Sequence, residues 1–141
     1  VQRARQLLTD GAQSSLSGCL GGNDQELTAK RVYEAASEDD QLAMQIVDET
    51  ARWLGLGVAT MVHLLDPGSV VLGGAMNFGG PDCPLGRRFL AGVIEEFRQR
   101  TFKNVFDGTR IKFATLGADA GYLGVAGYAR KEHNAAAETA A

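Results

Sequence analysis

The sequence predicts a helix-rich α/β fold that contains a short parallel β-α-β-α unit. Residues 41–65 place apolar side chains at helical spacing, and an aliphatic run at residues 69–72 follows directly. A second short run, at residues 110–115, comes after another amphipathic helical pattern. Strands of one sheet that are joined through a helix almost always form a right-handed crossover, so we expect these two strands to be parallel.

The first part of the chain has the pattern of two short helices joined by a loop. Residues 1–9 have their apolar positions on one side, which is typical of a short amphipathic helix. Residues 10–22 are rich in glycine and serine, which indicates a loop. Thr28 is a suitable N-cap for a helix that reaches Ala36, because its hydroxyl can accept a hydrogen bond from an amide of the first turn.

The long helix over residues 41–65 has clear ends and two internal glycines. Ser37 or Asp40 can cap its start, and the Asp-Pro-Gly sequence at residues 66–68 ends it, because proline cannot continue a helix. Gly55 and Gly57 each cost about 1 kcal/mol relative to alanine in a helix. We therefore expect their face of the helix to press against a neighbouring element.

The strand at residues 69–72 is followed by the candidate binding residues Gly73 and Gly74. The strand has no polar alternation, which favours burial on both faces. Open α/β sheets bind ligands at the carboxyl ends of their strands, and a glycine pair there leaves the main chain free for close approach. A Gly-Gly turn without any ligand explains the same pattern equally well.

A loop at residues 75–82 leads from this glycine pair to a helix over residues 84–101. We expect the arginines near the start of that helix, Arg87 and Arg88, to lie on a solvated face. The second strand alternates apolar and polar residues, which predicts a half-exposed face or a sheet edge.

The last helix, for which Asp119 is a natural N-cap, is unusually rich in glycine. Gly121, Gly124 and Gly127 together cost about 3 kcal/mol of helix propensity. We therefore expect this helix to be buried against backbone or against another helix. Residues 132–141 have no core face, so we expect a disordered tail there.

Composition narrows the classes of function. The net charge of −3, with acids and bases mixed along the chain, gives no electrostatic case for a nucleic acid or an anionic membrane as partner. No apolar run approaches the length of a membrane span. Cys19 and Cys83 lie far apart without metal-binding spacing, so we expect free thiols, a cytoplasmic location and no metal ligands in this chain.

Two strands are too few for an independent sheet. The chain also begins at Val1 and not at methionine. We therefore expect a missing N-terminal part that completes the sheet.

Two segments in order resemble the end of ROK proteins (repressors, open reading frames and sugar kinases). The first is the segment at residues 64–74, LLDPGSVVLGG, and the second is the segment at residues 115–127, TLGADAGYLGVAG. The resemblance is nearest to the bacterial glucokinase branch and extends from about Leu27 to Arg130.

This resemblance implies an actin-like ATPase (ribonuclease H-like) fold with two lobes around a cleft. Residues 1–131 would form the C-terminal portion of the second lobe. Family members transfer the γ-phosphoryl group of Mg-ATP to a sugar hydroxyl, so the implied ligands are ATP, Mg²⁺ and glucose or a related hexose. Gly73 and Gly74 match the family's adenosine motif, and Ala75 and Asn77 beside them are further candidates. A homo-oligomer is also implied.

Much of the family's active machinery is absent from this sequence. It has no DxGxT phosphate loop, no Asn-Asp pair that supplies the catalytic base, no second glycine-rich phosphate loop and no cysteine-rich zinc motif. No catalytic residue can be named, and we predict that this chain alone does not phosphorylate sugar. Two alternatives stay open: part of a sugar-responsive ROK transcriptional repressor, and a non-catalytic interaction module.

Overall fold

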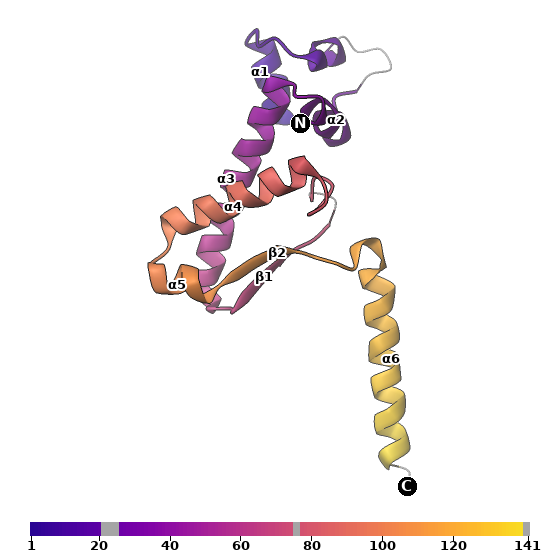
Figure 1. The fold of residues 1–141 in the computed structure, drawn as a ribbon. Coiled ribbons are helices and arrows are strands. Elements are labelled where there is room, and N and C mark those ends of the chain that lie inside the picture. The colour runs from indigo at the N-terminus through magenta and orange to yellow at the C-terminus, as the bar shows by residue number, and fades with distance from the viewer. Residues whose placement is uncertain (21–25, 75–76, 140–141) are drawn as a thin grey trace.

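The computed structural model describes residues 1–20, 26–74 and 77–139. Its elements follow the predicted order, with helices α, 3-10 helices η and strands β (Figure 1). In chain order they are α1 (Gln2–Thr9), η1 (Ser15–Leu20), α2 (Ala29–Ser37), α3 (Gln41–Leu65), β1 (Ser69–Leu72), α4 (Pro84–Arg100), α5 (Lys103–Gly108), β2 (Arg110–Phe113), η2 (Gly117–Asp119) and α6 (Ala120–Thr139). The helix-rich α/β prediction is therefore confirmed. The 3-10 helix η1 and the short helix α5 were not predicted.

Helix α3 is the longest element, and both of its predicted ends are confirmed. Asp40 is the N-cap: its carboxylate accepts a hydrogen bond of 3.0 Å from the amide of Ala43. At the other end, Asp66 takes a left-handed conformation with φ 47°, and the chain then turns through Pro67 into β1. Asp40 also binds the segment before α2, because it accepts hydrogen bonds from the hydroxyls of Ser14 and Ser15.

Replacement of Asp40 by alanine should lower the free energy of unfolding by about 1–2 kcal/mol, since it removes a helix cap. Partial burial raises the pKa of Asp40, but hydrogen bonds from the Ala43 and Ser15 amides and the Ser14 hydroxyl outweigh it, so the pKa lies below its ordinary value. The charged form therefore stabilises the fold above about pH 4, and this contribution disappears as the pH falls through the lowered pKa.

Urea denaturation over a range of pH tests the Asp40 prediction. Asp40→Asn keeps a capping oxygen, so it should lose much less stability than Asp40→Ala. The stability difference between wild type and Asp40→Asn should shrink as the pH falls from about 5 to below 3. A difference that stays constant over this range would contradict the role given to the charge.

The two strands form a parallel pair, as predicted, with Ser69 opposite Arg110 and Leu72 opposite Phe113. Helices α4 and α5 lie between them in the chain. The predicted burial of β1 on both faces is wrong, because Val71 is 55% exposed. One face packs on the hydrophobic core, and no described element covers the other. The core-facing strand residues are Val70, Leu72, Ile111 and Phe113.

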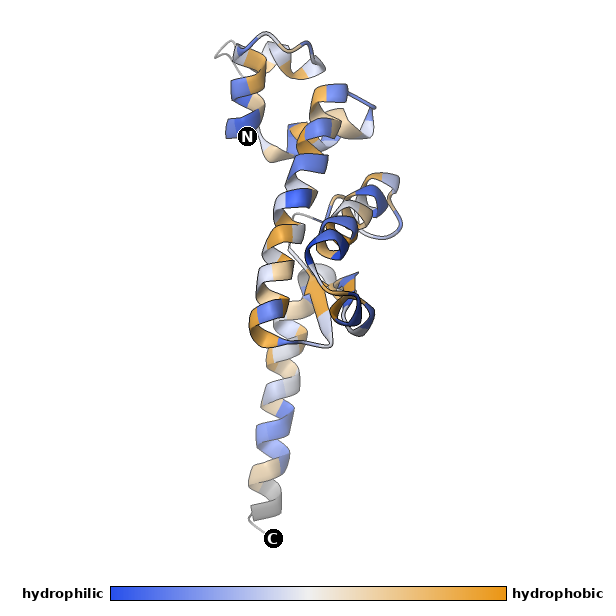
Figure 2. Cartoon of the chain, turned by 90° about the vertical axis from the view of Figure 1, so that its left-hand side faces the viewer, coloured by the Kyte–Doolittle hydropathy of each residue, from blue (hydrophilic) through white to orange (hydrophobic). Residues whose placement is uncertain are grey.

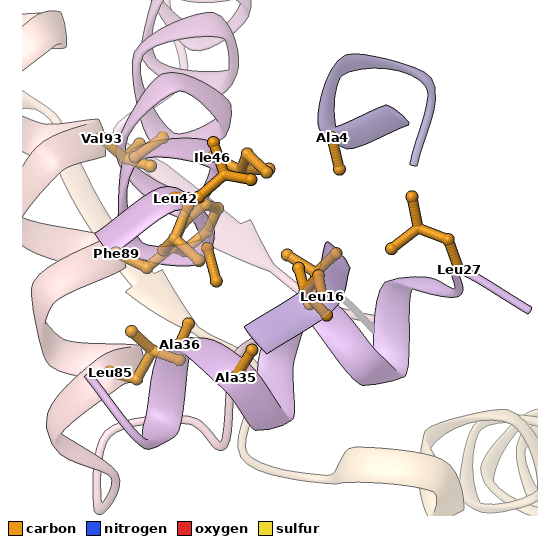
Figure 3. Close-up of a cluster of buried hydrophobic side chains, with 14 of the residues drawn as sticks. Ala4, Leu16, Leu27, Ala35, Ala36, Leu42, Ile46, Leu85, Phe89 and Val93 are labelled. Atoms are coloured by element: carbon orange, nitrogen blue, oxygen red, sulfur yellow. The ribbon is translucent and has the colours of Figure 1, made fainter. Parts of the chain in front are cut away.

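The hydrophobic core lies where α3 crosses α4, and it continues into the α1 and α2 region (Figure 3). Gly55 permits the crossing, since a Cβ atom there would lie 2.8 Å from the carbonyl oxygen of Val93. The expected close approach is therefore confirmed at Gly55. At Gly57 it is wrong, because an added Cβ would meet no described atom within 4 Å. Figure 2 shows hydrophobic and hydrophilic residues side by side along α3, as an amphipathic helix requires.

Helix α6 stands apart from the other elements (Figure 1). All side chains described in it, residues 120–136, are exposed. The expected burial of its glycines is wrong for the described chain, since a Cβ added at Gly121, Gly124 or Gly127 would meet nothing within 4 Å. The helix extends to Thr139. The packing partner inferred from these glycines is not among the described elements.

Candidate functional site

Gly73 and Gly74 lie at the carboxyl end of β1, and both are exposed. A Cβ atom added to Gly74 would meet no described atom within 4 Å, and one added to Gly73 would meet only the Cβ of Ala114, at an ordinary 3.6 Å. Gly74 also has a φ of +86°, which favours glycine. The ladder continues beside them, because the amide of Ala114 donates to the carbonyl of Leu72 at 2.7 Å. Among the described residues, therefore, no side chain covers the main chain at this strand end.

Of the two further candidates, Ala75 lies outside the described residues, whereas Asn77 begins a tight turn. The carbonyl of Asn77 accepts a hydrogen bond of 2.8 Å from the amide of Gly80. Its side-chain oxygen accepts a second one, of 3.3 Å, from the amide of Gly79. These two bonds close the turn that begins at Asn77, which is half-buried and follows Gly74 by three residues in the chain.

Three consecutive residues of this turn have positive φ: Phe78 at 48°, Gly79 at 85° and Gly80 at 73°. A bulky residue in this region is uncommon and costs about 1–3 kcal/mol, so the surroundings must compensate. The ring of Phe78 lies 4.5 Å from the ring of Phe89 in α4 and 6.4 Å from that of Tyr33 in α2, measured between centroids. Phe78 could not be predicted as a candidate, because a left-handed phenylalanine has no local sequence signal.

The main chain of the turn also rests directly on the first turn of α4. A Cβ atom at Gly86 would lie 2.1 Å from the carbonyl oxygen of Gly80, so only glycine fits there. A Cβ at Gly79 would lie 2.5 Å from the Cβ of Cys83. An internal glycine in the predicted helix over residues 84–101 was the sequence signal that could have identified this contact.

Cys83 is the N-cap residue of α4 and has the most unusual thiol environment described. Hydrogen bonds from the amides of Gly86 and Leu85 lower the pKa of this thiol below its ordinary value. The hydroxyl of Tyr33 lies 3.9 Å from its sulfur. This thiol lies three residues after the turn at residues 77–80.

The two arginines near the start of α4, Arg87 and Arg88, are exposed, as expected, but each has a partner. Arg88 forms a two-pronged ion pair with Asp48 of α3, with nitrogen-to-oxygen distances of 2.8 and 2.7 Å. Arg87 donates to the carbonyl oxygens of Pro81 and Asp82, both at 3.1 Å. Arg88 therefore links the two crossing helices, and Arg87 binds the main chain of the residues that precede α4.

A groove of about 1090 Å³ lies on the α1, α3 and α4 surface and does not include the candidate residues. Trp53, Arg52 and Glu95 are among the side chains that line it. Within the described ranges, no three His, Cys, Asp or Glu side chains lie close enough together to hold a metal ion. None of the helices described in the structure is both long and apolar enough to cross a membrane.

Comparison with known proteins shows which family has this sequence and arrangement. The model of the ROK family matches residues 8–132, which is most of the chain. This chain belongs to the ROK family. A glucokinase of Halalkalibacterium halodurans is 32% identical over 108 residues, which are 77% of this chain and 31% of that protein. A xylose repressor of Caldicellulosiruptor bescii is 30% identical over 102 residues, which are 72% of this chain and 24% of the repressor.

The solved structures include a ROK family glucokinase from Streptomyces griseus in complex with glucose and AMPPNP. It superposes with a TM-score of 0.71 and 28% identity, and the match covers 92% of this chain and 41% of that one. The described α/β arrangement is thus that of ROK proteins. The chain spans about a third or less of the length of the curated relatives named above.

Proposed function

We propose that this chain is the nucleotide-binding, C-terminal portion of an ATP-dependent hexose kinase, with glucose as the favoured substrate. Residues 1–131 would then belong to the second lobe of an actin-like ATPase (ribonuclease H-like) fold. The observation that carries the proposal is the uncovered main chain at Gly73 and Gly74, at the end of a parallel strand in a ROK protein. It is supported by a relative whose structure contains glucose and AMPPNP.

The residues at this strand end fit an adenine nucleotide. Gly73 and Gly74 have no side chains, so a flat ring can contact the peptide planes directly. Asn77 carries an amide that can donate to and accept from a base or a ribose. Mg-ATP would supply the phosphoryl group, and the residues described here would hold its adenosine part. We assign no catalytic base and no phosphate-binding residue to this chain.

The remaining machinery would come from an N-terminal lobe in the complete gene product. The exposed helix α6 supports this view, because its apolar side chains Tyr122, Val125 and Tyr128 are each more than 60% exposed. The chain spans 31% of the glucokinase relative, so a large part of such a protein lies outside these residues. We further propose a cytoplasmic homo-oligomer, for which a gel-filtration mass above that of one subunit is the test.

An assay of the complete gene product tests the proposal. With ATP, Mg²⁺ and glucose, it should form ADP and a phosphorylated sugar, whereas the isolated 141-residue chain should form none. Sugar phosphorylation by the isolated chain would contradict the proposal that the catalytic residues lie outside it. A complete gene product that neither binds an ATP analogue nor phosphorylates any hexose would overturn the kinase proposal.

Replacement of Gly73 by valine should weaken binding of an ATP analogue at least about tenfold, which is roughly 1.4 kcal/mol. The added side chain would occupy the surface on which the nucleotide rests, while Gly73 itself has no positive φ that valine would strain. Isothermal titration of the complete gene product measures this effect.

Gly68→Val is the matched control, because Gly68 precedes the other end of the same strand and also has open space around it. The control should bind the analogue like wild type. If both variants lost the same affinity for the analogue, or if Gly73→Val lost none, the nucleotide would not bind at this strand end.

A second candidate function is part of a sugar-responsive transcriptional repressor, and the similarity to a xylose repressor favours it. The complete gene product would then carry a DNA-binding segment and release its operator DNA when sugar is added. A gel-shift assay with the DNA upstream of its own gene, with and without glucose or xylose, separates the two candidates.

A further inference from the structure

We propose that Phe78 is a positioning residue for the nucleotide: its ring fixes residues 77–80 on α4, and this fixes the conformation of Asn77, the candidate nucleotide contact three residues after Gly74 in the chain. The inference rests on the proposed nucleotide site and adds to it a residue that touches no ligand. Three observations on the turn support it, and none of them concerns the glycine pair itself.

The first observation is the conformation of Phe78. Its φ of 48° is one that bulky side chains rarely take, so the turn would relax if nothing held it. The two glycines that follow are also at positive φ and offer no resistance of their own to such a change. The left-handed Phe78 is therefore maintained from outside the turn.

The second observation is what maintains it. The Phe78 ring lies 4.5 Å from the ring of Phe89, which is 0% exposed and belongs to the core. It also lies 6.4 Å from the ring of Tyr33, measured between centroids. Phe78 thus ties the turn to α4 and to α2 at once, and these elements are fixed by the core.

The third observation is that the closed turn also fixes Asn77. Asn77 directly precedes Phe78, and its two hydrogen bonds to the amides of Gly79 and Gly80 exist only while the turn is closed. With the ring in place, the turn stays closed and the Asn77 amide is ordered before any nucleotide arrives. Such preorganisation improves affinity by reducing the ordering that binding requires.

The experiment compares Phe78→Ala with Phe102→Ala in the complete gene product. Phe102 is 78% exposed and lies outside the candidate loop, so it controls for the loss of a phenylalanine. Phe78→Ala should raise the KM for ATP about tenfold, while the KM for glucose and the kcat at saturating ATP change less than about threefold. Phe102→Ala should change none of the three. Phe78→Tyr retains the ring and should restore most of the ATP affinity.

Hydrogen exchange keeps the test independent of catalysis. Without nucleotide, the amides of Gly79 and Gly80 should exchange at least about tenfold faster in Phe78→Ala than in wild type, since the turn opens. Wild-type binding of an ATP analogue with unchanged binding in Phe78→Ala would overturn this inference alone. Parallel losses for ATP and glucose would also overturn it, because they indicate a general structural defect. A wild-type protein that binds no ATP analogue overturns the proposed function and this inference together.

Discussion

Replacement of Phe97 by alanine is expected to lower the free energy of unfolding by about 3–5 kcal/mol, the range for a fully buried aromatic residue. Phe97 is 0% exposed and lies on the buried side of α4. Its ring centroid is 6.0 Å from that of Phe106, so it also connects α4 to the short helix α5. Alanine would leave a cavity between these elements, and such a cavity adds to the cost of the lost apolar contacts.

Urea denaturation of the purified chain measures this loss. Phe102→Ala is the matched control, since the same atoms are removed from a side chain that is 78% exposed, and it should stay within about 0.5 kcal/mol of wild type. A loss below about 1 kcal/mol for Phe97→Ala would mean that the core collapses around the cavity. Domains are stable by only about 5–15 kcal/mol, so the expected effect is a large share of the total.

The elements with strong local signals could be predicted from the sequence. The ends of α3 followed from a capping aspartate and from the Asp-Pro-Gly sequence, and β1 occupies the predicted residues 69–72. Helix α5 was missed, because its six residues, Lys103–Gly108, are too few to show a helical period. Short elements are fixed by their neighbours, in this case by the packing of Phe106 on Phe97.

Burial could not be predicted from residue type alone. Val71 and the glycines of α6 have the composition of buried segments, yet they are exposed in the described chain. A sequence indicates that an apolar surface is buried in the folded protein, but it does not show which element packs on that surface. The same holds at the candidate site. The position of Gly73 and Gly74 followed from the local strand pattern. The support by Phe78 depends on contacts with α2 and α4, which the sequence does not show.

Replacement of Gly86 by alanine is expected to lower the free energy of unfolding by about 3 kcal/mol, at the upper end of the range for overpacking. The added Cβ would lie 2.1 Å from the carbonyl oxygen of Gly80 and 2.9 Å from its amide nitrogen. These are main-chain atoms, so no side-chain rotation can relieve the contact. The turn at residues 77–80 must move away from α4, which would also pull the Phe78 ring from Phe89.

Gly92→Ala is the matched control on the same helix. Its Cβ would meet only the Cβ of Ala51, at 2.9 Å, so α3 and α4 must separate slightly, but no main-chain atom is contacted. Alanine also gains about 1 kcal/mol of helix propensity over glycine, which offsets much of that shift. Gly92→Ala should therefore stay within about 1 kcal/mol of wild type in urea denaturation. If the two variants lose equal stability, the turn is not seated on α4 as described, because only Gly86 places main chain against main chain.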